Sequence, residues 1–120
     1  MPRIGTTVSI KRNGDFSRAY RSAKTQAHPL AVTYVRRNRL GQKRLGITTS
    51  KKIGGAVERN RAKRIIRAAF AAVEPEVPRG WDIVVVARVK TTKAKSTELA
   101  PVLRRQLETL GVLRAQAGKE

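Results

Sequence analysis

Six polar residues within positions 56–73 have the side-chain types and the spacing needed to bind phosphate groups. They are Arg59, Asn60, Arg61, Lys63, Arg64 and Arg67. At about 100° per residue of a helix, most of them fall on one broad face, while Ala62, Ile66 and Val73 fall on another. Arginine matches the geometry of phosphate oxygens, and no carboxylate four residues away on the same face neutralises these cations. The pattern favours contact with nucleic acid over a solvated charged surface.

The composition of the whole chain points to the same class of partner. Its 120 residues include 27 Lys and Arg but 8 Asp and Glu, giving a formal net charge of +19. Such an excess repels itself unless a polyanion neutralises it. A membrane is the competing polyanion, but the sequence has no apolar run of about 18 residues and no apolar signal core at its start. We predict a nucleic-acid partner, no membrane and, with no cysteine present, a cytoplasmic location.

Residues for catalysis or metal binding are sparse. Without cysteine, and with His28 as the single histidine, the usual zinc sites cannot be assembled. The carboxylates are scattered along the chain, and a metal-dependent nuclease would need some of them to cluster. Asp15 and Asp82 are better explained by helix capping or ion pairing than by a shared metal. We expect no cofactor bound by the protein, no small-molecule substrate and no catalytic residue.

The first half of the chain predicts one helix and two strands. A helix beginning near Asn13 has four residues on one face, namely Phe16, Ala19, Tyr20 and Ala23. The β-branched and aromatic residues of 30–36 and the alternation of 44–50 predict the strands. The link 37–43 contains a glycine and several cations, which favours an antiparallel strand pair around an exposed basic loop.

The second half predicts helix, strand and helix. Gly54 and Gly55 permit a tight turn into a helix over 56–73, which the following prolines end. The nearly continuous apolar run 81–87 is typical of a central strand covered on both faces. A last helix opens at Ser96 or Thr97 and stops at Gly111, with apolar residues on one side. They are Leu99, Val102, Leu103, Leu107 and Leu110.

This order of elements predicts an α+β fold, a two-layer α/β sandwich in which helices pack on one central sheet. The chain has the length of one compact domain, and no interior linker is long enough to divide it. We therefore predict a single domain over residues 1–113. Residues 114–120 are expected to form a flexible basic tail.

The basic segment also resembles a known family. The run Ala56-x-x-Arg59-Asn60-Arg61-Ala62-Lys63-Arg64-Ile65-Ile66-Arg67, after residues 50–54, is similar to the signature of the bacterial ribonuclease P protein subunit, often called its RNR motif. Phe16, Tyr20, Tyr34 and the strand at 82–88 follow the family's order and spacing, so the resemblance covers roughly residues 8–110. Two departures are Ala62, where the family often has a larger aliphatic residue, and residues 36–43, which have no residue-by-residue match.

The resemblance implies both a topology and a function. The topology is α-β-β-β-α-β-α, with an unusual left-handed crossover that sequence reasoning alone does not predict. The function is that of the protein subunit of ribonuclease P, which joins a catalytic RNA and promotes removal of the 5′ leader from precursor tRNA. In such a complex the RNA and its Mg²⁺ perform the hydrolysis, which agrees with the sparse catalytic residues. The residues alone leave open two rivals, a small ribosomal or RNA-chaperone protein without an associated reaction and a self-sufficient nuclease.

Carried over by position, the resemblance also assigns residues to two RNA surfaces. Facing the catalytic RNA and nearby substrate would be Arg59, Asn60, Arg61, Lys63, Arg64 and Arg67, extended by Lys51 and Lys52. A cleft for the single-stranded leader would contain Phe16, Tyr20, Tyr34, Thr48 and Ser50. Stacking on the aromatic rings and hydroxyl contacts would hold the leader with modest sequence preference. Without the resemblance, Phe16 and Tyr20 would more simply belong to the core.

Overall fold

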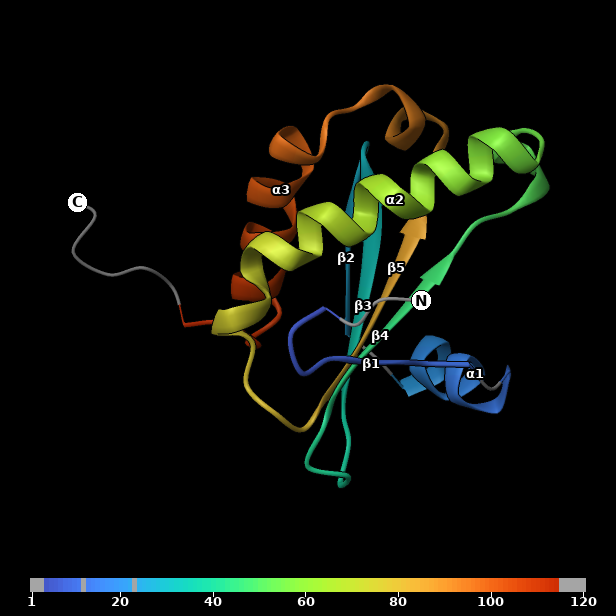
Figure 1. Ribbon diagram of the computed structural model, residues 1–120. Coiled ribbons are helices and arrows are strands. Elements are labelled where there is room, and N and C mark those ends of the chain that lie inside the picture. The colour runs from blue at the N-terminus through green and yellow to red at the C-terminus, as the bar shows by residue number, and fades with distance from the viewer. Residues whose placement is uncertain (1–3, 12, 23, 115–120) are drawn as a thin grey trace.

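The computed structural model describes residues 4–114 apart from 12 and 23 (Figure 1). These residues form the strands and helices β1 Val8–Ser9, α1 Asn13–Ser22, β2 Lys24–His28, β3 Ala31–Arg37, β4 Lys43–Thr48, α2 Ala56–Val73, β5 Trp81–Ala87 and α3 Ser96–Thr109. Short 3₁₀ helices connect some of them, η1 Lys51–Ile53, η2 Glu74–Glu76 and η3 Val89–Lys93. Ala23 and the predicted tail, except Arg114, lie outside the described residues. Within the described part, no helix is long and apolar enough to cross a membrane.

The strands form one mixed sheet in the order β1-β4-β5-β3-β2. Strand β5 pairs in parallel with β4 and antiparallel with β3, so the central strand predicted from its apolar run is confirmed. A strand with hydrogen-bonding groups buried on both edges must be paired on both edges, which is why this segment takes the middle position. The α+β fold class predicted from the order of elements is confirmed as well.

The antiparallel pair predicted for 30–36 and 44–50 is wrong. Strands β3 and β4 run in opposite directions, but β5 lies between them and forms the ladders on both sides. The loop that joins β3 and β4 therefore spans the position of a third strand. Strands β1 and β2 had not been located from the sequence, because β1 has two residues and β2 is a largely polar edge strand.

The crossover connection from β4 through α2 to β5 is left-handed, as the family resemblance implies. Strands β4 and β5 are parallel neighbours, and α2 crosses in front of the sheet in Figure 1. In that view both strands run upward and β5 lies to the left of β4. A connection that passes in front of the sheet and moves to the left is left-handed. Helix α2 thus begins beyond the β4 side of the sheet and runs back across it. Nearly all such connections in proteins are right-handed.

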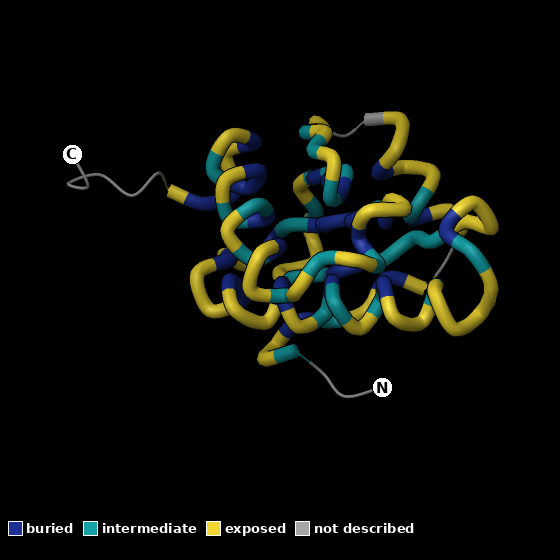
Figure 2. Tube along the Cα trace, turned by 90° about the horizontal axis from the view of Figure 1, so that it is seen from above, coloured by how far each residue is buried: buried dark blue, intermediate teal, exposed yellow. Residues whose placement is uncertain are grey.

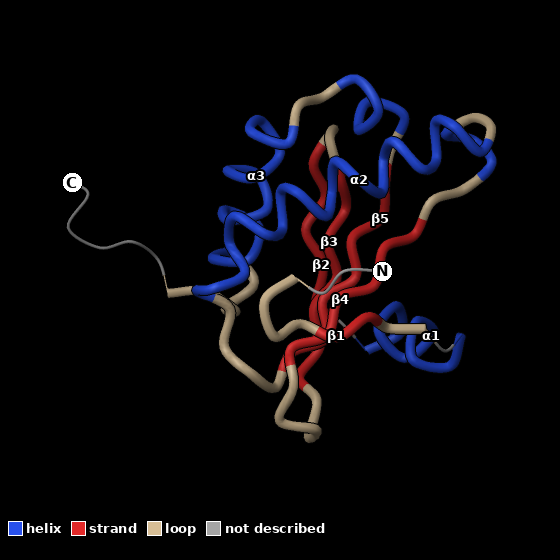
Figure 3. The backbone as a smooth tube through the Cα atoms, in the orientation of Figure 1, coloured by secondary structure: helices blue, strands red, loops and turns tan. Residues whose placement is uncertain are grey.

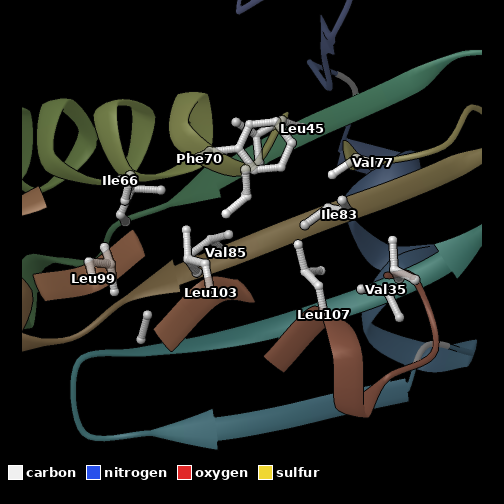
Figure 4. Close-up of a cluster of buried hydrophobic side chains, with 14 of the residues drawn as sticks. Val35, Leu45, Ile66, Phe70, Val77, Ile83, Val85, Leu99, Leu103 and Leu107 are labelled. Carbon is white, nitrogen blue, oxygen red and sulfur yellow. The ribbon is translucent and has the colours of Figure 1, made fainter. Parts of the chain in front are cut away.

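The main core lies between the sheet and the pair of helices α2 and α3. Ile66 and Phe70 of α2 pack with Leu103 of α3 over Ile83 and Val85 of the central strand (Figure 4). All five of these side chains are almost completely buried. Figure 2 shows that the exposed residues of the helices follow their outer turns while the buried residues line the interior. The sequence thus places an apolar stripe on each helix where it meets the sheet.

Helix α1 covers the opposite face of the sheet, so helices lie on both sides (Figure 1). A smaller apolar cluster forms there from Ile10, Ala19 and Val84, with Phe16 and Tyr34 packed against it. Because successive residues of a strand point to opposite faces, Val84 contributes to this cluster and its neighbours to the main core. This second face is covered by one helix, whereas α2 and α3 together cover the first.

A buried glutamine ties α3 to the edge of the sheet. Gln106 accepts a 2.6 Å hydrogen bond from Thr33 Oγ1 and donates to the carbonyl oxygens of Gln26 and Ala31 at 3.1 and 3.0 Å. Sequence analysis had assigned only apolar residues to this helix face. The contact satisfies a hydroxyl group buried in the sheet, which would otherwise be destabilising.

Candidate nucleic-acid interface

Helix α2 begins where two glycines let the chain turn and a glutamate caps the free backbone. Gly54 has a φ of 136°, a region that side chains other than glycine rarely adopt. Glu58 accepts a 3.1 Å hydrogen bond from Gly55 N and lies in the first turn, where the helix dipole favours an anion. The buried residues of the helix are Ala62, Ile66, Ala69, Phe70 and Val73. Their burial sets the rotation of α2 and turns its cations outward.

The residues predicted to bind phosphate lie on the outer side of α2. Exposed on it are Asn60, Arg61 and Arg64. Half-buried at its flank are Arg59, Lys63 and Arg67. Among the described residues, none of these five cations has a carboxylate oxygen within 4.0 Å. Their positive charge is therefore not neutralised within the described structure, and we call these six residues the α2 basic face.

The α2 basic face continues onto neighbouring elements. Lys63 and Arg67 line a narrow groove of about 130 Å³ together with Thr7 and Ser9 at strand β1. At the other end, Lys51 and Lys52 of η1 are exposed shortly before the helix begins. The two predicted lysines thus lie in the short 3₁₀ helix that leads into α2.

Three aromatic rings gather on the opposite face of the sheet, between α1 and β3. The rings of Tyr20 and Tyr34 meet edge to face, with centroids 5.0 Å apart and an interplanar angle of 76°. The rings of Phe16 and Tyr20 follow at 6.5 Å on the same helix face. Tyr20 is 39% exposed, so this group is not simply core. We call these three residues the aromatic cluster.

Thr48 joins the aromatic cluster but Ser50 lies elsewhere. The hydroxyl groups of Tyr20 and Thr48 share a 2.6 Å hydrogen bond that links α1 to β4. Gly46 makes the close packing possible, since a Cβ there would lie 2.6 Å from Phe16 Cε1. Ser50 is exposed beyond the end of β4, where its carbonyl accepts a hydrogen bond from Ile53 N at 3.0 Å. It belongs with η1 and its two lysines.

Arg44 connects the carboxylates of Asp15 and Asp82, and sequence analysis missed it. Its Nε and Nη2 each lie 2.8 Å from an oxygen of the fully buried Asp82, and its Nη1 lies 3.3 Å from Asp15. Hydrogen bonds to Asp82 raise the pKa of Arg44. The pKa of Asp15 is lowered, mainly by its hydrogen bond from Arg18 and also by Arg44, against the opposing effect of burial. Of the two roles expected for these aspartates, helix capping or ion pairing, the structure shows ion pairing for both. The signal in the sequence that could have pointed to this cation was Asp82, a carboxylate at the beginning of an otherwise apolar strand.

A second buried carboxylate holds the beginning of the chain against the end of α2. Glu74 accepts hydrogen bonds from Thr7 Oγ1 at 2.8 Å, Thr6 N at 3.1 Å and Lys43 Nζ at 3.1 Å. Burial alone would raise the pKa of Glu74, but these hydrogen bonds and the charge of Lys43 lower it below its usual value. Across the described residues, no three His, Cys, Asp or Glu side chains are grouped so that they could hold a metal ion.

The fold and its surfaces define a class of small, strongly basic α+β proteins that carry a cationic helix on one side of a sheet and a cluster of aromatic rings on the other. The model of one family, ribonuclease P, matches residues 4–111. The chain belongs to this ribonuclease P protein family, and the resemblance inferred from the sequence is confirmed.

Relatives and solved structures agree with this assignment. The ribonuclease P protein component of a Thermoanaerobacter species is 39% identical over 87 residues, which cover 72% of this chain and 75% of that protein. That of Dehalococcoides mccartyi is 39% identical over 104 residues, covering 87% and 85%. The RNase P protein structure from Staphylococcus aureus aligns with a TM-score of 0.76 at 34% identity, covering 88% of this chain and 97% of that one. The structure from Thermotoga maritima aligns with a TM-score of 0.66 at 29% identity, covering 90% and 97%.

Proposed function

We propose that this chain is the protein subunit of the ribonucleoprotein ribonuclease P, in which it binds the catalytic RNA and the 5′ leader of precursor tRNA. The complex removes that leader by endonucleolytic cleavage. The observation that carries the proposal is that a member of this family presents a cationic helix without carboxylate partners among its described residues. Charge left unpaired on an ordered helix is suited to a partner rich in phosphate.

The two surfaces take different parts in this function. The α2 basic face, with Lys51 and Lys52, neutralises phosphates of the catalytic RNA and screens the repulsion between the two RNA molecules. The aromatic cluster with Thr48 holds the leader, because the face of a partly exposed aromatic ring stacks on an unpaired base of any sequence. Ser50 and the η1 lysines lie at the end of β4 that leads from the cluster toward α2. The leader therefore has a path between the two surfaces.

Hydrolysis is assigned to the RNA and to Mg²⁺ that the RNA holds. Several protein carboxylates are already engaged by cations, Asp15 and Asp82 by Arg44 and Glu74 by Lys43. A Mg²⁺ ion needs oxygen ligands in near-octahedral geometry, and it keeps several of its waters. The engaged carboxylates do not fit such a role. The protein contributes by lowering phosphate repulsion, which favours Mg²⁺ occupancy in the RNA.

A cleavage assay tests the proposal against its two rivals. Precursor tRNA is incubated with the full chain, with catalytic ribonuclease P RNA, and with both together at low Mg²⁺. We expect cleavage at the 5′ end of the mature tRNA to be stimulated when both are present, and no cleavage by the protein alone. Cleavage by the protein alone would identify a self-sufficient nuclease. RNA binding without any stimulation would identify a ribosomal or RNA-chaperone protein.

A further inference from the structure

A second group of arginines lies between α1 and the loop that joins β3 to β4. A hollow of about 610 Å³ is bounded by α1 on one side and by the loop between β3 and β4 on the other. In Figure 3 this loop projects from the sheet at the end of β4 that is opposite η1. The arginines that line the hollow are Arg18, Arg36, Arg37, Arg39 and Arg44. Residues 36–43 are the segment that had no residue-by-residue match to the family's pattern.

Three of these five arginines have no carboxylate partner in the described part of the chain, and one of the three, Arg37, packs on an aromatic ring instead. Arg44 is held by Asp82 and Asp15, Arg18 pairs with Asp15, and Arg37 lies 5.1 Å from the centre of the Trp81 ring. For Arg36 and Arg39, no carboxylate oxygen of the described chain lies within 4.0 Å. Arg36 is opposite Asp82 in the β3–β5 ladder, but both oxygens of that carboxylate already bind Arg44.

The loop that carries Arg39 is held in shape by Asn38. The Asn38 side chain donates to Asp82 Oδ1 at 2.7 Å and to the Gln42 carbonyl at 3.2 Å, and it accepts from Leu40 N at 2.9 Å. The Asn38 backbone N–H also bonds to the Gly80 carbonyl at 2.8 Å. Arg39 thus lies between two anchored residues, so binding a ligand requires little further ordering of the backbone.

Register places the hollow in line with the aromatic cluster. Tyr34 and Arg36 are two residues apart on β3, so their side chains share the α1 face about 7 Å from each other along the strand. Tyr34 contacts Tyr20 on that face, and Asp15 and Arg18 of the hollow precede Tyr20 on α1. A single strand of RNA lying across the aromatic cluster reaches the hollow when it continues away from η1.

We propose that Arg36 and Arg39 bind backbone phosphates of the leader beyond the bases held by the aromatic cluster. The inference rests on the proposed function and adds a second leader subsite to it. If the catalytic RNA binds at α2 and η1, the tRNA-proximal end of the leader lies there and its distal end lies over the hollow. Charge favours the leader as the ligand, because guanidinium groups without carboxylate partners match phosphate oxygens. Position favours it as well, because the hollow continues from the aromatic cluster along β3.

A series of leader lengths tests the proposal. Holoenzyme is assembled with wild-type protein or with the double variant Arg36→Gln, Arg39→Gln, and its Kd is measured for precursor tRNAs whose leaders grow by one nucleotide at a time. The matched control is Lys95→Gln, Arg105→Gln, which removes the same charge from exposed residues of the α3 region on the opposite face of the sheet. Circular dichroism confirms that the variants are folded.

For the wild type we expect affinity to rise in a further step once the leader is long enough to reach the hollow. The double variant should lose that step and bind long leaders like shorter ones, with a slope of log K against log salt reduced by about 0.7 for each lost phosphate contact. The control should keep the step. An unchanged step in the double variant would overturn the proposal.

Two further outcomes separate this proposal from the proposed function. An equal loss for long and short leaders would mean that Arg36 and Arg39 contact the catalytic RNA, which overturns the leader subsite but leaves the subunit function intact. No dependence of wild-type affinity on the presence of a leader would overturn the leader cleft itself, and the subsite with it.

Discussion

The phenol oxygen of Tyr20 lies 2.6 Å from the hydroxyl oxygen of Thr48, so that residues 28 positions apart join helix α1 to strand β4 by one hydrogen bond. This contact crosses the open side of the sheet. It holds the exposed ring of Tyr20 against Tyr34 in an edge-to-face arrangement. The shape of the aromatic cluster therefore depends on a polar contact as well as on packing.

Tyr20→Phe should lower the free energy of unfolding by about 0.5 kcal/mol, at the low end for a hydrogen bond because the pair is solvent-accessible. Thr48→Val should have a similar effect. The double variant should be hardly less stable than either single one, because both changes remove the same bond. Urea unfolding of the three variants measures this, and additive losses would contradict the contact.

Tyr34→Ala should weaken binding of leader-bearing precursor tRNA to the holoenzyme by about 1 to 3 kcal/mol, the range for loss of one stacked base. Mature tRNA has no leader and should bind with nearly unchanged affinity. Equilibrium binding of both substrates measures the difference. Equal losses for the two would point to a folding defect rather than to a leader contact.

Replacing Arg59, Arg61 and Arg64 of the α2 basic face by alanine should weaken assembly with the catalytic RNA. Each lost phosphate contact should also reduce the slope of log K against log salt by about 0.7 to 0.9. Titration of the RNA at several salt concentrations gives both quantities. The α2 assignment fails if affinity and slope match those of an Arg105→Ala control on the exposed side of α3.

Arg44→Met should destabilise the fold by about 3 kcal/mol or more, because it leaves the fully buried carboxylate of Asp82 without its cation. Removing both charges with Arg44→Met and Asp82→Leu should restore part of the loss, since no buried charge is then left unpaired. Chemical denaturation of the single and double variants tests this. A double variant less stable than Arg44→Met would argue against the pairing.

Stability should fall at acid pH through Glu74. Its pKa in the folded protein is lowered, so ionised Glu74 stabilises the fold fully above its unfolded pKa of about 4.3. That contribution is lost as pH falls through the lower, folded-state pKa. The wild type should therefore be more stable than Glu74→Gln at neutral pH, and the difference should shrink below about pH 4. Thermal unfolding of both proteins across this pH range measures the difference, and a constant gap would contradict the assignment.

Local patterns in the sequence were sufficient for the helices and for the central strand. The apolar stripe of α2 and the polar residues beside it are set by the helical repeat, which needs no tertiary information. The run 81–87 likewise predicted its central position, because a strand apolar on both faces must be covered on both. The order of Arg59, Asn60, Arg61, Lys63, Arg64 and Arg67 identified the family.

The tertiary structure alone decided which strands are neighbours and which side chains meet. Strand β5 separates β3 from β4. The short loop between β3 and β4 favoured a hairpin, because the residues of β5 that pair with both strands are distant in the sequence. The same pairing brings Arg44 and Arg36 to either side of Asp82, and the left-handed crossover brings α2 back over the sheet. Sequence by itself determined a cationic helix and a family, because these depend on residue types at local spacing. Sheet order determined the aromatic cluster and the arginine-lined hollow, because these depend on contacts between distant residues.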